Sequence, residues 1–143
     1  MKTKMFHSFG SGAASILFGL GQFYGSEAMD SFAKLQKKEQ KTIDIFQVAI
    51  EFGRATGWGK ITPTFSSDML TINVENCCFC DGMKMSTPVC YEFAGIISET
   101  LSSLAKENIS IKEMQCIGKG DSVCKFEATI TKSLRDALRT YTF

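Results

Sequence analysis

The residue types best suited to bind a metal are concentrated in the stretch EMQCIGKGDSVCKFE, residues 113–127. Cys116 and Cys124 flank a glycine-rich turn and are separated by seven residues. In a hairpin centred on Gly120 they lie roughly opposite each other, with Cβ atoms about 4.5–5.5 Å apart. Two thiolates at that separation can share a zinc ion, because zinc–sulfur bonds are about 2.3 Å long.

A closed zinc site needs two further ligands, and the sequence offers two candidates. Cys90 opens a predicted helix, whose N-terminus favours the thiolate form. Glu113 lies on the same predicted strand as Cys116, but the two are three positions apart, so a regular strand points them to opposite faces. Either a β-bulge re-aims one of them, or Glu113 is not a ligand.

The remaining cysteines leave several alternatives open. Cys116 and Cys124 could also be buried free thiols or form a cross-strand disulfide. Cys77, Cys78 and Cys80 form a compact cluster in which positions 77 and 80 have C-x-x-C spacing. These residues could supply missing ligands, hold a separate metal, or pack as buried thiols in a loop.

Composition sets limits on the class of protein. A chain of 143 residues suits one domain spanning residues 1–143, and 44% hydrophobic with 22% charged residues is typical of a globular protein. The net charge of +1 does not favour direct binding to nucleic acid or to an anionic membrane. The 12 phenylalanines suggest aromatic surface for an apolar ligand pocket. Candidate wall residues are Trp58, Phe79, Tyr91, Phe93 and Met114.

The N-terminal segment has a basic start followed by an apolar run, as in a signal peptide. Several glycines interrupt the run, no A-x-A site follows it, and it is too short to span a membrane. We therefore expect a cytoplasmic protein with reduced cysteines.

Hydrophobic periodicity places the elements around these residues. It predicts helices over residues 11–24, 27–38 and 40–56, with a break at Gly25-Ser26-Glu27. The second and third helices could also be continuous. Residues 60–66 and 69–76 predict a hairpin, with Leu70, Ile72 and Val74 on its buried face.

A second helix-and-hairpin unit follows. Ser86 or Thr87 is the expected N-cap of a helix that runs to about Glu107 and stops at Asn108. Residues 109–117 and 122–131 predict the second hairpin, and 132–139 a short helix. This order favours an α+β domain, with a mostly antiparallel sheet of about four strands and helices packed on it.

The same residues resemble a known family. CIGKGDSVCKFE is similar to the C-terminal signature of the 4-vinyl reductase domain, usually C-x-A-x-G-D-x-x-C-x-F. Further similar pieces occur in the family's order: a glycine-containing first helix, Gly57-Trp58-Gly59 before a hairpin, and the helix that begins CYEFAG. The resemblance runs from about Gly10 to Ile130.

The resemblance implies a fold like the ligand-binding fold of nitric oxide sensors and vesicle-tethering subunits. Members include predicted hydrocarbon-binding proteins and the sensor domains of phenol-responsive activators, which bind zinc through three cysteines and a glutamate. It thus implies zinc at Cys90, Glu113, Cys116 and Cys124, a hydrophobic or aromatic ligand, and a homodimer. The Cys77–Cys80 cluster lies outside the usual pattern, and His7 lies outside the motif.

Three functions follow for testing. The first is a small-molecule binding or sensor domain with a structural zinc site. The second, carried by the family's name, is reduction of a vinyl group on a tetrapyrrole. The chain has no G-x-G-x-x-G after a predicted strand and no evident acid–base pair, so catalysis has no support in the sequence. The third is a structural or interaction module that uses the glycine-rich first helix.

Overall fold

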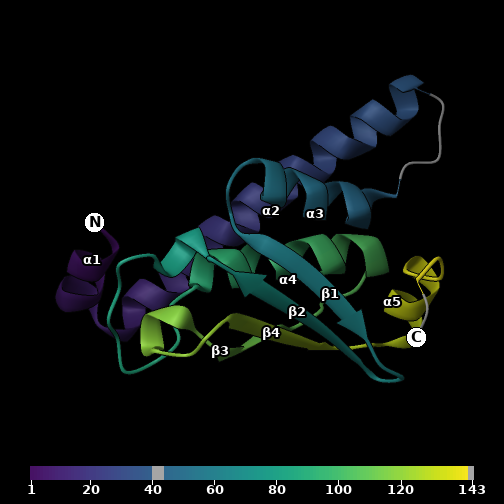
Figure 1. Cartoon of the computed structure of the whole chain (residues 1–143). Coiled ribbons are helices and arrows are strands. Elements are labelled where there is room, and N and C mark those ends of the chain that lie inside the picture. Colours follow the sequence, from purple (N-terminus) through teal and green to yellow (C-terminus); the bar gives the residue numbers. More distant parts are fainter. Residues whose placement is uncertain (40–43, 142–143) are drawn as a thin grey trace.

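Four strands form one antiparallel sheet in the order β1-β2-β4-β3 in the computed structural model, which describes residues 1–39 and 44–141. The strands are β1 (Lys60–Phe65), β2 (Met69–Glu75), β3 (Lys112–Gln115) and β4 (Cys124–Thr129). Helices pack against this sheet (Figure 1). The expected α+β architecture is confirmed.

The first hairpin follows the alternation in the sequence. Phe65 pairs with Leu70, and Ser66 N–H donates to Met69 O at 2.9 Å to close the turn. Leu70, Ile72 and Val74 are buried, as predicted. Because side chains alternate along a strand, these three positions provide the sheet's contribution to the core.

The helices are α1 (Lys2–Phe9), α2 (Ser11–Glu39), α3 (Ile45–Ala55), α4 (Tyr91–Ala105) and α5 (Lys132–Ala137). α4 lies between the sheet and α2, so it is buried on two sides (Figure 1). On the sheet side, the ring of Phe93 contacts that of Phe126 in β4, with centroids 5.2 Å apart. Two short 3-10 turns, Cys78–Cys80 and Ile117–Lys119, complete the elements of the described residues.

The predicted break at Gly25-Ser26-Glu27 is wrong, because α2 is continuous through it. Gly25 is needed for packing instead: a Cβ there would lie 2.9 Å from Cβ of Glu99 in α4. At Gly21 a Cβ would lie 2.0 Å from Glu92 O. These glycines let α2 and α4 approach closely, which a local stop signal resembles in sequence.

Two further boundaries differ near the N-terminal half. α1 was not predicted, since its residues were interpreted as the start of an apolar leader-like run. α3 begins after Asp44, whose carboxylate accepts from Gln47 N–H at 3.0 Å. The expected start of this helix at 40 falls in residues 40–43, outside the described part. No helix in the described residues combines the length and hydropathy that crossing a membrane requires.

The ends of α4 also differ from expectation. Its N-cap is Cys90 rather than Ser86 or Thr87, and its end is Lys106, which is left-handed at φ 55°, rather than Asn108. The reason at the first end is tertiary, because Glu113 Oε2 accepts from Cys90 N–H at 2.9 Å. A side chain 23 positions away therefore caps the amide that a local Ser or Thr was expected to serve.

The second hairpin is shorter than predicted. β3 and β4 occupy only the centre of the expected strands over 109–117 and 122–131. Upstream of β3 the chain is fixed to α4, because Ser98 Oγ donates to Ile109 O at 2.7 Å and Ile109 N–H donates to Ser102 Oγ at 2.9 Å. α5 covers most of the expected 132–139 helix.

Candidate functional site

Five buried cysteines converge where the loop after β2, the start of α4 and the second hairpin meet. They are Cys77, Cys80, Cys90, Cys116 and Cys124, and each is at most 2% exposed. All are free thiols, which excludes the cross-strand disulfide for this structure. Cys78 is exposed and lies outside the cluster.

The sulfur–sulfur distances match those of a tetrahedral thiolate site. Sγ of Cys90 lies 3.8 Å from that of Cys77, 3.9 Å from that of Cys116 and 3.7 Å from that of Cys124. Cys80 Sγ lies 3.4 Å from Cys124 Sγ. A tetrahedron with zinc–sulfur bonds of about 2.3 Å has sulfur–sulfur edges of about 3.8 Å.

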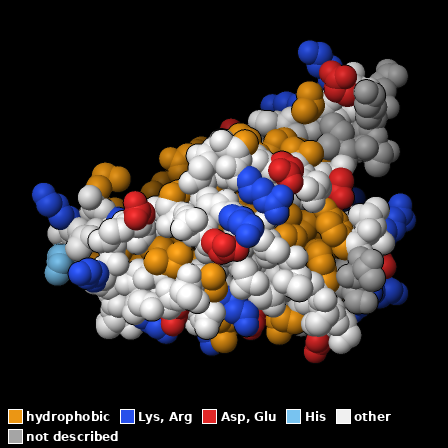
Figure 2. Space-filling model, viewed as in Figure 1, with side chains coloured by type: hydrophobic (Ala, Val, Ile, Leu, Met, Phe, Trp, Pro, Cys, Tyr) orange, Lys and Arg blue, Asp and Glu red, His pale blue; other side chains and the backbone are white. Residues whose placement is uncertain are grey.

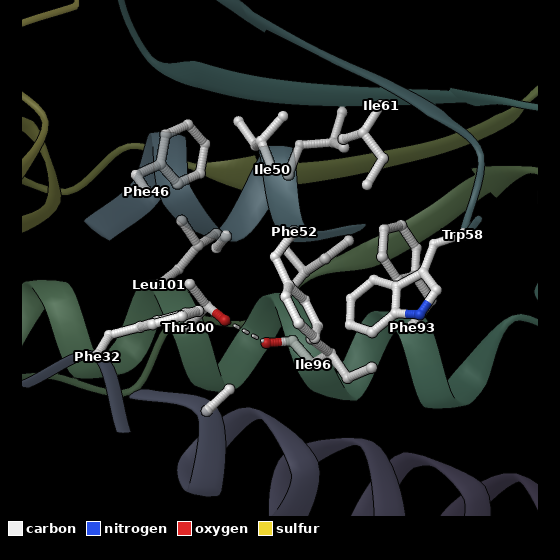
Figure 3. Close-up of a pocket in the computed structure, with 14 residues that line it drawn as sticks. Phe32, Phe46, Ile50, Phe52, Trp58, Ile61, Phe93, Ile96, Thr100 and Leu101 are labelled. Atoms are coloured by element: carbon white, nitrogen blue, oxygen red, sulfur yellow. Dashed lines mark hydrogen bonds between the residues drawn. The ribbon is translucent and has the colours of Figure 1, made fainter. Parts of the chain in front are cut away.

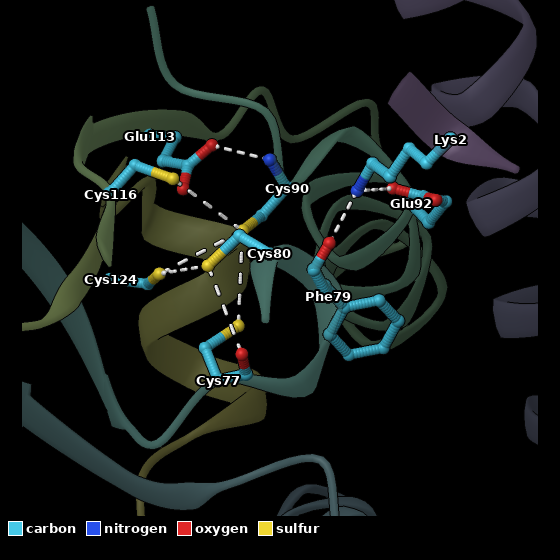
Figure 4. A network of polar contacts seen from close by, with 9 residues as sticks. All are labelled: Lys2, Cys77, Phe79, Cys80, Cys90, Glu92, Glu113, Cys116 and Cys124. Atoms are coloured by element: carbon cyan, nitrogen blue, oxygen red, sulfur yellow. Dashed lines mark hydrogen bonds and ion pairs between the residues drawn. The ribbon is translucent and has the colours of Figure 1, made fainter. Parts of the chain in front are cut away.

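The donor atoms form two overlapping sets of four, each with all members within 4.8 Å of one another. One set is Cys77, Cys80, Cys90 and Cys124, and the other is Cys90, Glu113, Cys116 and Cys124. In Figure 4, Glu113 and Cys116 lie on one side of the cluster and Cys77 on the other. The structure therefore brings together the four residues selected from the sequence, and adds Cys77 and Cys80 to them.

A register shift in β3 explains how Glu113 reaches the cluster. Glu113 pairs with Phe126 and Gln115 with Lys125, so Met114 is the extra residue of a bulge. A bulge changes which way the following side chains point. The irregularity expected between Glu113 and Cys116 is therefore present.

Glu113 has the bonding of a carboxylate that lacks a partner. Its Oε2 accepts from Cys90 N–H, whereas its buried Oε1 has no hydrogen-bond partner within the described residues. Burial is the main cause that raises the pKa of Glu113 to about 8. An unsatisfied buried carboxylate oxygen costs free energy, and a cation would remove that cost.

Hydrogen bonding among the sulfurs changes their acidity. The contact with Cys124 is the main cause that lowers the pKa of Cys116 to about 6. Contacts led by Cys116 lower the pKa of Cys80 and raise those of Cys90 and Cys124. Because one sulfur can donate only if its neighbour accepts, the cluster contains both thiolate and thiol character. Thiolate is the form that binds metals.

Backbone groups support the cluster from outside. Ile117 N–H donates to Cys124 Sγ at 3.3 Å, and Asp121 Oδ2 accepts from Cys116 N–H at 2.8 Å. The loop that carries Cys80 is fixed by Met85 N–H, which donates to Gly118 O at 2.8 Å. The residues present therefore fit zinc: soft thiolate donors at tetrahedral spacing, a buried carboxylate, and a supporting shell.

A separate apolar cavity lies between α2, α3, α4 and the first hairpin (Figure 3). Its volume is about 60 Å³, against the roughly 10–15 Å³ that one water occupies on the same kind of measure. It is lined by Ala28, Phe32, Phe46, Ala49, Ile50, Phe52, Trp58, Ile61, Ile72, Phe93, Ile96, Ile97, Thr100 and Leu101. None of these carries a titratable side chain. The hydroxyl of Thr100 donates to Ile96 O at 2.8 Å.

The candidate pocket residues from the sequence lie in different places. Trp58 and Phe93 line the apolar cavity, and Phe79 stacks on Phe93 behind them at 5.0 Å between centroids. Tyr91 lines a more open hollow beside α2 and Glu113. Met114 is 41% exposed on β3.

Three aromatic rings connect this cavity to the cysteine cluster. Trp58 meets Phe79 and Phe93 edge-on, with centroids 5.6 Å and 6.0 Å apart. Phe79 sits between Cys78 and Cys80, and Cys78 N–H donates to Trp58 O at 3.2 Å. The wall of the cavity and the loop carrying two of the thiols are therefore in direct contact.

Comparison with known proteins identifies the part of the chain that carries the cysteines. Residues 70–130 match the model of the 4-vinyl reductase domain. The chain carries a 4-vinyl reductase domain. The match begins in β2 and ends just after β4, so it includes all five clustered cysteines and Glu113.

Relatives of this 4-vinyl reductase domain protein include two uncharacterised proteins of Methanocaldococcus jannaschii. One is 33% identical over 63 residues, which are 44% of this chain and 35% of the relative. The other is 24% identical over 126 residues, which are 87% of this chain and 69% of the relative. The chain thus spans about a third of the first relative.

Two solved structures share the fold. The phenol-responsive sensory domain of the transcription activator PoxR, in complex with phenol, has a TM-score of 0.75 at 15% identity, covering 99% of this chain and 78% of that one. A vinyl-4-reductase family protein of Methanocaldococcus jannaschii has a TM-score of 0.59 at 17% identity, covering 80% and 68%. At these identities the likenesses establish the fold alone.

The apolar cavity extends beyond the matched residues. Its walls from α2, α3 and β1 precede residue 70, and include Phe32, Phe46 and Phe52, which sequence reasoning did not select. The only available signal was the high phenylalanine count. Periodicity marks such residues as buried, but it does not distinguish a cavity wall from filled core.

Proposed function

We propose that this chain is a binding or sensor domain for a small hydrophobic or aromatic molecule, with a structural zinc site at Cys90, Glu113, Cys116 and Cys124. The observation that carries the proposal is the cavity beside Trp58 and Phe93, walled by aromatic and aliphatic side chains. Ligand sites in proteins are predominantly apolar concavities with a few polar groups. Here the Thr100 hydroxyl is the polar group positioned to contact a ligand.

The chemistry of the cavity favours binding over catalysis. No side chain that lines it can donate or accept a proton near neutral pH. The PoxR domain with the same fold is a sensory domain. A reductase would require an acid or a hydride donor placed at this wall, and an interaction module would not require a cavity.

Zinc would have a structural role in this proposal. When bound, it would neutralise Glu113 and the thiolates and join the second hairpin to the start of α4. Three thiolates and one carboxylate fill a tetrahedral shell, which leaves no open position for substrate. Cys90 would position the end of α4 from which Phe93 enters the cavity.

A homodimer is the second part of the proposal. Ile16, Leu20, Phe23 and Tyr24 are between 43% and 59% exposed on the face of α2 that does not contact α4. Gly12 and Gly19 have no neighbouring atoms within 4 Å of a built Cβ, so a partner backbone can approach there. Figure 2 shows charges of both signs interspersed over the visible face, with hydrophobic side chains reaching the surface near α2 and beside β1.

A thermal-shift titration with phenol and a panel of small aromatics tests ligand binding. A ligand at about 100 times its Kd should stabilise the fold by about 2.7 kcal/mol. Ala28 lines the cavity and Ala33 is exposed on the same helix. Ala28→Leu should abolish the shift by filling the cavity, and Ala33→Leu should keep it. No shift across the panel, or an equal shift in both variants, would contradict the proposal.

A further inference from the structure

The cysteine cluster has more donors than a single metal ion can use. Six ligand groups converge there: the five buried thiols and the carboxylate of Glu113. One tetrahedral zinc takes four. Two tetrahedra that share one edge need six donors in total, of which two belong to both.

We propose that the centre binds two zinc ions bridged by the thiolates of Cys90 and Cys124. One ion would be held by Cys77 and Cys80, and the other by Glu113 and Cys116, with both bridging sulfurs completing each shell. The second half rests on the zinc site proposed above. Cys77 and Cys80 thereby become metal ligands, in addition to the four residues of that site.

The geometry supports a shared edge. Cys90 and Cys124 are the two residues common to both sets of four donors, and their sulfurs are 3.7 Å apart. That separation matches the edge of about 3.8 Å expected for a zinc–thiolate tetrahedron. Each remaining pair lies on its own side of this edge, as Figure 4 shows for Cys77 against Glu113 and Cys116.

A single ion leaves buried donors without a role in either arrangement. An ion in the four-cysteine set leaves the buried Oε1 of Glu113 without a partner. An ion in the glutamate set leaves Cys77 and Cys80 unused, although Cys80 Sγ lies only 3.4 Å from the ligand Cys124. Only two ions use every donor of the cluster.

The electrostatic balance is no worse with two ions. Six deprotonated ligands and two divalent cations leave a net charge of −2, the same as three thiolates, one carboxylate and a single cation. The Ile117 N–H bond to the bridging Cys124 Sγ and the N-terminus of α4 at the bridging Cys90 both place positive dipoles beside the shared edge.

The positions of Cys77 and Cys80 are fixed by contacts independent of any ion. Met83 N–H donates to Cys80 O at 3.1 Å, and Gly118 packs against Cys80, because a Cβ at Gly118 would lie 3.1 Å from Cys80 Cβ. The residue after Cys77, Cys78, is held by Trp58 O. A preformed pair of thiols lowers the cost of ordering ligands around a second ion.

Native mass spectrometry of the full chain, combined with metal analysis, tests the proposal. We expect two zinc ions per wild-type chain, one in Cys80→Ser, and one in Cys116→Ser. The exposed Cys78→Ser variant is the matched control and should retain two. Cadmium substitution followed by NMR should give two metal resonances in the wild type, a readout that needs no variant to fold.

Each other outcome decides a different point. One ion in the wild type and one in Cys80→Ser would overturn the two-ion centre but support the zinc site at Cys90, Glu113, Cys116 and Cys124. One ion in the wild type and none in Cys80→Ser would overturn both, in favour of the four-cysteine set. A metal-free wild type purified with zinc, or an iron–sulfur absorption spectrum, would likewise overturn both.

Discussion

At the scale of single residues, Glu113 distinguishes a metal centre from a cluster of buried thiols. Free cysteines pack as small apolar side chains and do not need a ligand. A carboxylate buried among them, with one oxygen bonded to Cys90 N–H and the other without a partner among the described residues, is costly unless a cation is present. The pKa of Glu113, which burial raises to about 8, expresses the same cost.

Replacing Glu113 with glutamine should therefore weaken zinc binding. The amide retains an oxygen that can accept from Cys90 N–H but loses the negative charge. We expect zinc affinity to fall by at least the roughly 10–100-fold that loss of a supporting group causes at metal sites. Competition with a chromogenic chelator measures this. Glu75→Gln is the control, since Glu75 forms a half-exposed surface pair with Lys60; equal affinities in both variants would exclude Glu113 as a ligand.

At the scale of elements, the contact between α2 and α4 determines where the start of α4 lies. Gly21 of α2 faces the carbonyl of Glu92, and Gly95 of α4 faces that of Phe18. Both contacts lie close to the helix N-terminus that carries Cys90. The close approach thus positions Cys90 and Phe93, which belong to the metal centre and the cavity respectively.

Gly21→Ala should be strongly destabilising, because its Cβ would lie 2.0 Å from backbone oxygen and the helices must move apart. We expect a loss of about 1–3 kcal/mol or more in the free energy of unfolding, measured by urea titration. Gly19→Ala on the same helix meets no atom within 4 Å. It should stabilise by about 0.5–1 kcal/mol through helix propensity. Similar effects of the two substitutions would show that the helices do not pack this closely.

At the scale of the whole molecule, one face of α2 is buried by α4 and another is exposed and apolar. Exposed apolar stripes of this kind commonly mark association surfaces. The stripe runs along the N-terminal half of α2, opposite the layer that contains α4 and the sheet. A second copy that buries it would leave the metal centre accessible to zinc during folding.

A charge placed in this stripe should prevent dimerisation without unfolding the chain. Phe23 is 59% exposed, so Phe23→Glu costs little in the monomer. We expect its dimer dissociation constant to rise by at least about 10-fold, since burying an unpaired carboxylate costs well over 1.4 kcal/mol. Analytical ultracentrifugation measures the constant. Leu35→Glu, farther along α2, should leave it unchanged; a wild-type monomer at all concentrations would rule out the dimer.

The sequence by itself determined the α+β class, the first hairpin and its buried face, because these follow from local periodicity. It also selected Cys90, Glu113, Cys116 and Cys124 and required a bulge between Glu113 and Cys116, which the structure contains at Met114. Spacing within one hairpin is enough for such an inference, since few backbone geometries join the two strands.

Only the tertiary structure decided the rest. The continuity of α2 through Gly25, the capping of α4 by Glu113, and the approach of Cys77 and Cys80 to Cys90 and Cys124 all depend on segments far apart in the chain. Local propensity describes the conformations a segment favours in isolation, whereas close backbone contact and buried hydrogen bonds select among them. For that reason the sequence indicated that thiols would gather, and the fold determined how many share one centre.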